Sequence, residues 1–150
     1  AILAGKGDDA KILSLADLPH DFVFSNAFGE KSEAFEPVQE MVNQTEKFLF
    51  IIPEYNGSFP GILKAFIDAC DFPHSFQGKK AALLGHSTGK YGNIRGVEHF
   101  TGICHYIGLN VMPLKLHISH IHTELDAEGK LTDPKTIAFC QEQIDRLISF

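Results

Sequence analysis

KFLFIIPEYNGSFPGILKAFIDA, residues Lys47 to Ala69, decides the fold prediction because it joins three patterns in one stretch. Lys47 to Pro53 is a short apolar run bounded by turn residues, which is typical of a strand covered on both faces by helices. A polar turn follows, from Glu54 to Ser58. The next pattern is an apolar stripe at helical spacing, made of Ile62, Leu63, Phe66, Ile67 and Cys70, with Lys64, Asp68 and Asp71 on another face. The stretch predicts a strand, a turn and an amphipathic helix.

Strand and helix patterns continue on both sides of this stretch. On the N-terminal side we expect a half-buried or edge strand over Lys11–Leu18 and a short helix with Phe35, Val38, Met41 and Val42 at helical spacing and Pro37 in its first turn. On the C-terminal side we expect a buried strand over Lys80–Gly85, followed by a glycine-rich loop over His86–Asn93. The next element is a helix that stops at Gly108 and has five residues inward: Val97, Phe100, Ile103, Cys104 and Ile107. A strand over Asn110–His117 follows this helix. A last helix is expected to be capped by Asp133, to have Pro134 at its first position, and to turn Ile137, Ile144, Leu147 and Ile148 toward the core.

This alternation of strands and helices predicts an α/β fold with a doubly wound parallel sheet. Each crossover between parallel strands needs a helix to return the chain in the same direction. No repeat or linker interrupts the pattern, so we expect residues 1–150 to form a single domain. Ligands of such sheets bind beyond the carboxyl ends of the strands, which directs attention to the loops after Ile52, Leu84 and about His117.

The composition narrows the class of protein. The 150 residues carry 13 Lys and Arg against 19 Asp and Glu, a formal charge of −6, which lacks the basic footprint expected for nucleic-acid or anionic membrane binding. No apolar run approaches the roughly 18 residues that a membrane span needs, and no secretory signal pattern opens the sequence. The cysteines, Cys70, Cys104 and Cys140, are odd in number and far apart, as in reduced cytoplasmic proteins. We expect a cytoplasmic protein.

The turn that follows the first buried strand has side chains suited to a flat ligand. Backbone amides and the positive end of the next helix favour an electron-rich or anionic group. Tyr55 offers a planar surface, and the Asn56 amide can donate and accept hydrogen bonds at once, as a heteroaromatic ring requires. An equally weighted alternative is an ordinary strand-to-helix turn in which Asn56 and Gly57 supply unusual backbone angles.

The second loop, His86 to Asn93, is rich in glycine and hydroxyl groups. Glycine there allows a ligand to approach the backbone closely. The loop is similar to a phosphate cradle, but Gly89-Lys90 is followed by Tyr91, so it does not match the nucleotide-binding GxxxxGK[ST] pattern and a kinase or ATPase is disfavoured.

Two other kinds of site are weighed and disfavoured. His117, Ser119, His120 and His122 form the densest histidine group, with Glu124 as the only nearby third metal ligand; solvated loop histidines are the favoured interpretation, and no metal site is predicted. A nucleophile would need Cys104 beside His105 or Ser87 beside His86. Adjacent residues of a helix point about 100° apart, so the cysteines are interpreted as core residues.

Four segments carry a resemblance to a known family: PEYNGSFPGILKAFIDA (Pro53–Ala69), LADLP (Leu15–Pro19), GKKAALLGHSTGKYG (Gly78–Gly92) and ELDAEGKLTD (Glu124–Asp133). They resemble the NADPH-dependent FMN reductase family, which has a flavodoxin-like, three-layer α/β/α fold. The resemblance implies bound FMN as cofactor. The cofactor-binding residues that it implies are Pro53, Glu54, Tyr55, Asn56, Gly57 and Ser58 in the first loop and His86, Ser87, Thr88, Gly89, Gly92 and Asn93 in the second. Family members often have paired glycines in the second loop, whereas Asn93 follows Gly92 here, so contacts with the flavin edge are expected to differ.

The resemblance also implies a reaction. NAD(P)H, as co-substrate, would deliver hydride to flavin N5, and the electrons would pass to a small-molecule acceptor: a quinone, an azo compound, a metal oxyanion or a free flavin. No catalytic side chain is expected, because the cofactor carries the chemistry. The resemblance implies a homodimer or homotetramer, with an interface around the helix that carries Lys64 and Asp68; the two side chains could alternatively pair locally.

The beginning of the sequence departs from the family pattern. Members open with an apolar strand and a Gly-Ser-x-Arg-type loop for the FMN phosphate, whereas Ala1 to Ala10 resembles the end of the helix that comes next. We therefore expect an N-terminally incomplete version of a longer protein that lacks the usual first strand, with weakened FMN binding. The alternative is a noncatalytic flavodoxin-like binding or electron-transfer module.

Overall fold

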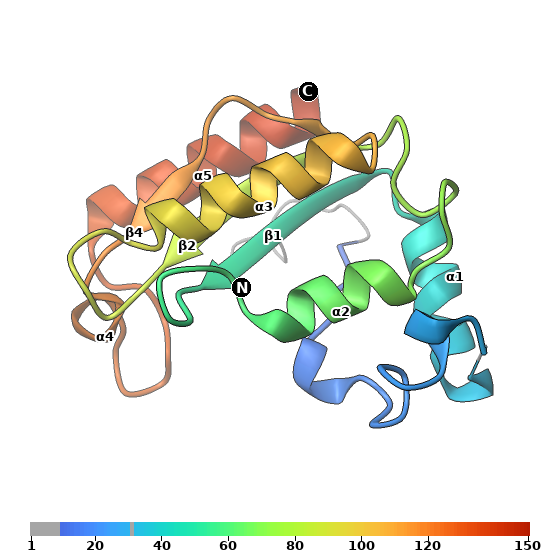
Figure 1. Ribbon diagram of the computed structural model, residues 1–150. Helices are drawn as coiled ribbons and strands as arrows, with labels where there is room; N and C mark the ends of the chain where they lie inside the picture. The colour runs from blue at the N-terminus through green and yellow to red at the C-terminus, as the bar shows by residue number, and fades with distance from the viewer. Residues whose placement is uncertain (1–9, 31) are drawn as a thin grey trace.

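The computed structural model describes residues 10–30 and 32–150, which contain four strands and five α-helices besides short 3-10 turns (Figure 1). The α-helices are α1 (Glu36–Gln44), α2 (Gly61–Ala69), α3 (Ile94–Tyr106), α4 (Ile121–Glu124) and α5 (Pro134–Ser149), and the strands are β1 (Lys47–Pro53), β2 (Lys80–His86), β3 (Asn110–Val111) and β4 (Leu116–Ile118). The 3-10 turns are η2 (Leu15–Asp17), η3 (Asn26–Phe28) and η4 (Glu33–Phe35).

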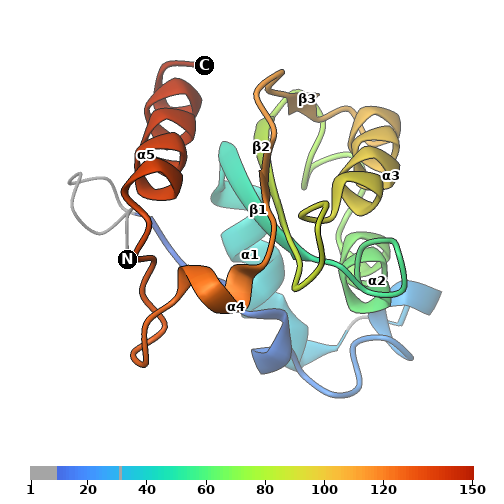
Figure 2. The same ribbon diagram turned by 90° about the vertical axis from the view of Figure 1, so that its left-hand side faces the viewer.

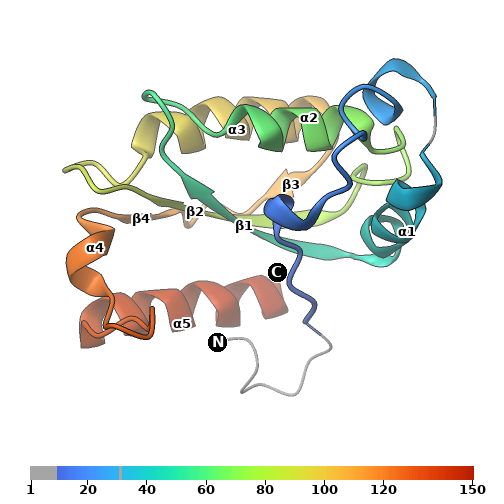
Figure 3. The same ribbon diagram turned by 90° about the horizontal axis from the view of Figure 1, so that it is seen from below.

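The sheet is parallel throughout, as predicted. β2 lies in its centre, with β1 on one side and β3 and β4 on the other. Figures 2 and 3 show α2 and α3 on one face of the sheet and α5 on the opposite face. This arrangement confirms the three-layer α/β/α class, and it brings the carboxyl ends of β1, β2 and β4 to one edge of the molecule.

Aromatic and aliphatic side chains fill the layer between the sheet and α2 and α3. Phe50 of β1 meets Phe100 of α3 edge-on, with ring centroids 5.1 Å apart, and Phe59 contacts the same ring at 5.5 Å. In the opposite layer, Ala82, Met112 and Leu147 form a second buried cluster. The helices on the first face therefore hold β1 and β2 in place, and with them the loops at their carboxyl ends.

Helix cover over β1 is less complete than predicted. Ile51 is 61% exposed and Leu49 is only half-buried, because α5 packs mainly over β2 and β4. Three apolar residues expected to face the core are also more than a third exposed, namely Ile62, Ile137 and Ile148. They lie at the margins of their helix stripes, where the helix surface turns away from the sheet.

Two predicted strands differ in the structure. The segment Lys11–Leu18 is irregular with a 3-10 turn, so the predicted edge strand is wrong. Leu18 is buried in the core, so the alternating pattern arises from core contacts of a coil that pairs with no strand of the described residues. The predicted strand Asn110–His117 is broken into β3 and β4 around Pro113, which lacks the N–H that a continuous ladder needs. The interpretation of Ala1 to Ala10 falls largely outside the described residues.

The predicted start of the last helix, α5, is confirmed. The Asp133 side chain accepts a hydrogen bond from the Thr136 N–H and Pro134 occupies the first turn of α5. This bond lowers the pKa of the Asp133 carboxyl.

Within the part of the chain that the structure describes, no helix combines the length and the apolar character required to cross a bilayer.

Candidate functional site

The two loops singled out in the sequence lie side by side at the carboxyl edge of the sheet. Pro53 is paired with His86 at the ends of β1 and β2, and His86 is paired with Ile118 of β4. The Glu54 N–H donates to the His86 carbonyl at 3.0 Å and carries the contact one residue past the strand. The predicted proximity of the two loops is therefore a direct result of the strand register.

The first loop contains a tight turn closed by its own backbone. Tyr55 and Ser58 exchange two backbone hydrogen bonds of 2.9 and 3.0 Å, while Asn56 and Gly57 between them adopt φ values of 51° and 76°. Two successive left-handed residues define a type I′ turn, for which Asn-Gly is the preferred pair. The interpretation of Asn56 and Gly57 as suppliers of unusual backbone angles is thus confirmed, and it is compatible with a binding role.

The second loop is held by distant backbone groups. The Ser87 N–H donates to the Ile118 carbonyl, and the His120 and Ile121 N–H groups donate to the Gly89 and Ser87 carbonyls, at distances of 3.0 to 3.1 Å. The chain after β4 therefore forms a third wall next to the two loops.

A pocket of about 410 Å³ lies between these walls, within the size range of small-molecule and cofactor sites. Its lining includes eight of the twelve predicted residues, namely Pro53, Glu54, Asn56, Gly57, His86, Ser87, Thr88 and Gly89. Ile121 also lines it and was missed, because only the pairing after β4 brings this residue to the loops. The role of the eight residues as cofactor contacts stays a prediction.

Four predicted residues do not line the pocket. Tyr55 is 61% exposed at the outside of the turn, and the Ser58 hydroxyl lies 3.1 Å from Nδ1 of His99 on α3. Gly92, at φ 56°, packs so tightly on β4 that a Cβ there would lie 2.7 Å from the His117 carbonyl carbon. Gly92 is therefore required for loop packing.

Asn93 is the fourth residue, and it joins the two loops. Its side chain is 1% exposed and its Nδ2 donates to the Ile52 and Pro53 carbonyls, at 3.0 Å each. Its Oδ1 accepts from the Gly96 N–H at 3.1 Å and caps α3. The structure thus gives Asn93 a positioning role that the sequence pattern did not indicate.

Both loops contain backbone donors that are left without a protein partner. Among the described residues, the N–H groups of Asn56 and Gly57 and those of Thr88 and Gly89 have no protein acceptor. Unpartnered amides at the surface of a pocket are available to a ligand's carbonyl oxygens, ring nitrogens or anionic groups. Burial lowers the pKa of His86, so this pocket residue stays neutral to lower pH than a solvated histidine.

The structure gives no support to a cysteine nucleophile. Cys70, Cys104 and Cys140 are buried, and burial raises the pKa of Cys70 and of Cys104 to about 12. These thiols remain protonated and unreactive at neutral pH, which confirms their interpretation as core residues. Of the residues described, no three His, Cys, Asp or Glu side chains gather at one point, and the rings of His120 and His122 lie 6.2 Å apart.

Comparison with known proteins identifies the relatives of this chain. It is 36% identical over 119 residues to the NAD(P)H-dependent FMN reductase of Pseudomonas aeruginosa, a match that covers 76% of this chain and 63% of that protein. It is 28% identical to a 2-hydroxy-1,4-benzoquinone reductase of a Burkholderia species, with 89% and 80% of the two chains covered. The chain thus spans less than two thirds of the length of the Pseudomonas reductase.

Solved structures agree with this relationship. The flavoenzyme NAD(P)H:(acceptor) oxidoreductase of Paracoccus denitrificans superposes with a TM-score of 0.73 at 27% identity and covers 93% of this chain and 78% of its own. An NADH:FMN oxidoreductase in its apo form reaches a TM-score of 0.77 at 15% identity, covers 99% of this chain and 76% of its own, and supports the fold.

The family model described as NADPH-dependent FMN reductase matches residues 1–123. This match confirms the resemblance inferred from the loop sequences. The chain belongs to the NADPH-dependent FMN reductase family.

Proposed function

We propose that this protein binds FMN in the pocket between its two loops and passes electrons from NAD(P)H to a small-molecule acceptor of the quinone type. The observation that carries the proposal is the pair of loops with unpartnered amides, Asn56 and Gly57 on one wall and Thr88 and Gly89 on another. The isoalloxazine ring has carbonyl oxygens and ring nitrogens along one edge, and these groups are the acceptors that such amides suit.

The other pocket residues fit the same ring. Pro53 and Ile121 supply apolar contacts, and the Asn56 side chain can serve a donor and an acceptor of the ring at once. Gly89 has no side chain and little beside it, so a planar ligand can approach its backbone closely. The residues present therefore fit a flavin ring, and the cofactor contacts that the family resemblance implies become part of the proposal.

Bound FMN would supply the hydride and electron chemistry. The task of the chain is to orient the ring and to limit the access of water to it. The type I′ turn fixes one wall through its own hydrogen bonds, and Asn93 fixes the distance between the two walls. Rigid, preorganised walls reduce the cost of ordering the site when ligands bind.

The acceptor class rests on the relatives. Besides the Burkholderia protein, a relative from Pseudomonas putida that is 29% identical over 146 residues is named a quinone reductase. Quinones are flat, neutral and small, and the pocket has apolar as well as polar lining. We therefore place quinones ahead of azo compounds, metal oxyanions and free flavin as acceptors.

We include a homodimer or homotetramer and a cytoplasmic location in the proposal. The Lys64–Asp68 pair forms locally at 2.7 Å, and Ile62 on another face of α2 is 40% exposed. An exposed apolar residue on this helix suits a subunit contact. Light scattering of the purified protein measures the number of subunits, and a monomer at all concentrations would remove this part of the proposal.

The visible spectrum of the purified protein tests the function. Protein is incubated with excess FMN, passed over a desalting column and mixed with NADPH under nitrogen. We expect retained flavin absorbance that bleaches with NADPH and returns when benzoquinone is added. Protein that retains no flavin at micromolar concentration would contradict the proposal, and retained flavin that NADPH does not bleach would favour a noncatalytic flavin-binding module.

A further inference from the structure

The two arginines of this chain stand in opposite surroundings. Arg146 lies in the last turn of α5, and its guanidinium is 2.6 Å from the Glu142 carboxylate. Arg95 lies in the first turn of α3, is exposed, and has no acidic partner among the described residues. Arg146 is neutralised at the C-terminal end of its helix, which favours a cation. Among the described residues Arg95 is unpaired, and it lies at the N-terminal end of its helix, which disfavours a cation.

The acidic residue that could neutralise Arg95 within its own helix is engaged elsewhere. Glu98 follows Arg95 by three positions, which is a spacing that allows a helical ion pair. Its carboxylate instead binds Lys115 at 2.9 Å, and this contact lowers the pKa of Glu98. The charge of Arg95 is therefore left available to a ligand.

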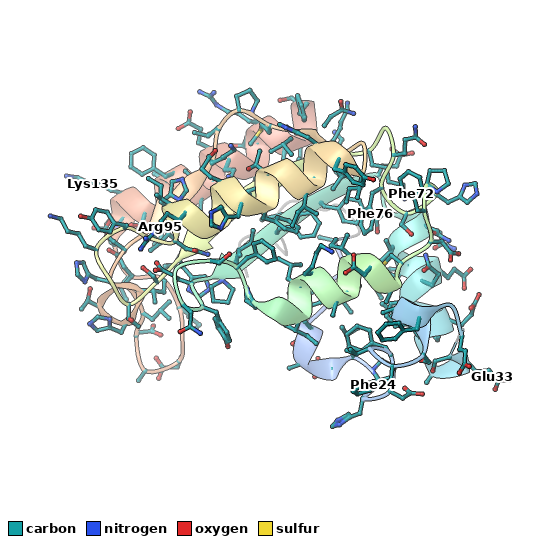
Figure 4. The ribbon with its side chains drawn as sticks, viewed as in Figure 1. Phe24, Glu33, Phe72, Phe76, Arg95 and Lys135 are labelled. Carbon is teal, nitrogen blue, oxygen red and sulfur yellow. The ribbon has the colours of Figure 1, made fainter. Side chains whose placement is uncertain are left out.

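Arg95 is also held at the candidate site. Its guanidinium packs against the type I′ turn, with Nη2 3.6 Å from the position that a Cβ of Gly57 would occupy. Gly57 lines the pocket, so the Arg95 guanidinium lies at the pocket's rim. Figure 4 shows Arg95 at the end of α3 beside this loop. In a chain with a net charge of −6, this local cation offsets a field that otherwise repels anions.

We propose that Arg95 binds a phosphate group of the dinucleotide co-substrate at the rim of the flavin pocket. The planar guanidinium matches a phosphate with two parallel hydrogen bonds, which is the strongest form of such contacts. This inference rests on the proposed function, because the dinucleotide approaches the same pocket. Two phosphates could serve: the 2′-phosphate, which only NADPH carries, and the pyrophosphate, which NADPH and NADH share.

Calorimetric titration of the FMN-treated protein with NADP⁺ and with NAD⁺ tests the proposal without relying on turnover. In Arg95→Gln we expect NADP⁺ to bind about tenfold more weakly, as for one lost charge-assisted contact. Unchanged NAD⁺ affinity would assign the contact to the 2′-phosphate, and an equal loss for both nucleotides would assign it to the pyrophosphate. Arg95→Lys should recover part of the loss because it keeps the charge but not the planar fork.

Arg146→Gln is the matched control. It removes the other arginine, far from the pocket on α5, and should leave both nucleotide affinities unchanged. Unfolding provides a second readout: Arg95→Gln should keep or slightly raise the midpoint, because a cation leaves a helix N-terminus, while Arg146→Gln should lower it slightly. A purely structural Arg95 would instead lower the midpoint in Arg95→Gln.

Several results would overturn the assignment. One is that Arg95→Gln binds both nucleotides within about twofold of the native affinity. Another is that Arg146→Gln loses as much nucleotide affinity as Arg95→Gln does. A third is that Arg95→Gln no longer retains FMN, which would place Arg95 on the cofactor. A native protein that binds neither nucleotide would also overturn it. A native protein that binds NADP⁺ but retains no FMN would instead refute the proposed function and leave the Arg95 result readable.

Discussion

The two loops of the pocket are built by different means. The turn from Tyr55 to Ser58 closes on itself through backbone hydrogen bonds between its own ends. The loop from His86 to Asn93 has its shape imposed by groups far away in sequence, at Ile52, Pro53 and residues 118–121. A local turn needs only its own residues, whereas the second loop needs the assembled sheet. Changes in the second loop should therefore affect stability more, and changes in the first should affect binding more.

The largest effect is expected where the second loop packs against the end of β2. In Gly85→Ala the new Cβ would lie 2.5 Å from the Gly92 carbonyl oxygen and 2.7 Å from a methyl carbon of Val97. The loop and the helix must shift to remove these clashes, which should lower the free energy of unfolding by about 2 to 4 kcal/mol. Urea unfolding measures the change.

Gly102→Ala is the control for that substitution. It lies in α3 with no atom within 4 Å of the added Cβ, and it should raise the free energy of unfolding by about 0.5 to 1 kcal/mol because alanine favours helix. Equal effects of the two substitutions would show that the second loop is not tightly packed against β2.

The connection between the loops should give the next largest effect. Asn93→Gly keeps the left-handed backbone but removes the bonds to the Ile52 and Pro53 carbonyls and the cap of α3. We expect a loss of about 2 to 3 kcal/mol in unfolding free energy and weaker FMN retention. Asn110→Ala, which removes similar but exposed bonds to Gly78 and Lys79, should cost less than half as much. Similar losses in both variants would contradict a special role for Asn93.

The first loop should show the opposite balance. Asn56→Gly preserves the turn and removes the side-chain amide, so we expect nearly native stability and about tenfold weaker FMN binding. Asn56→Ala should add a stability loss of about 1 to 2 kcal/mol, because alanine is strained at φ 51°. Fluorescence titration with FMN measures the affinity. Native affinity in both variants would remove Asn56 from the site.

The smallest effect concerns pH. Because burial lowers the pKa of His86, the unfolded chain binds its proton at higher pH than the folded protein. The unfolding free energy should therefore fall as pH drops through about 6.5 toward the lower pKa of the folded state, and the contribution should be constant above that window. His86→Gln should flatten this part of the profile when urea unfolding is followed between about pH 5 and about pH 8. An unchanged slope would assign the pH dependence to other groups.

The same contrast explains how far the sequence could predict the structure. Lys47–Pro53, Lys80–His86 and the helices after them follow from local periodicity, and the Asn56-Gly57 turn follows from residues that prefer it. Strand register then made the loops after β1 and β2 neighbours. The false strand at Lys11–Leu18 arose because alternation is also produced by a coil that contacts the core.

The parts of the site that were missed depend on tertiary contacts. Ile121 reaches the pocket only through pairing after β4, and Asn93 faces the first loop only because α3 and β1 pack together. The free charge of Arg95 depends on Lys115 capturing Glu98 across 17 positions. Neither residue spacing nor composition contains these relationships, because each one is set by elements that meet only in the folded chain.

The central claim is that the two loops form one flavin site with their free amides. A nitrogen–proton correlation spectrum, recorded while FMN is added to labelled protein, tests it most directly. We predict that the amide signals of Asn56, Gly57, Thr88 and Gly89 shift together and saturate at one affinity, whereas signals on α5 remain in place. Saturable shifts confined to residues outside both loops, or shifts in one loop alone, would contradict the account.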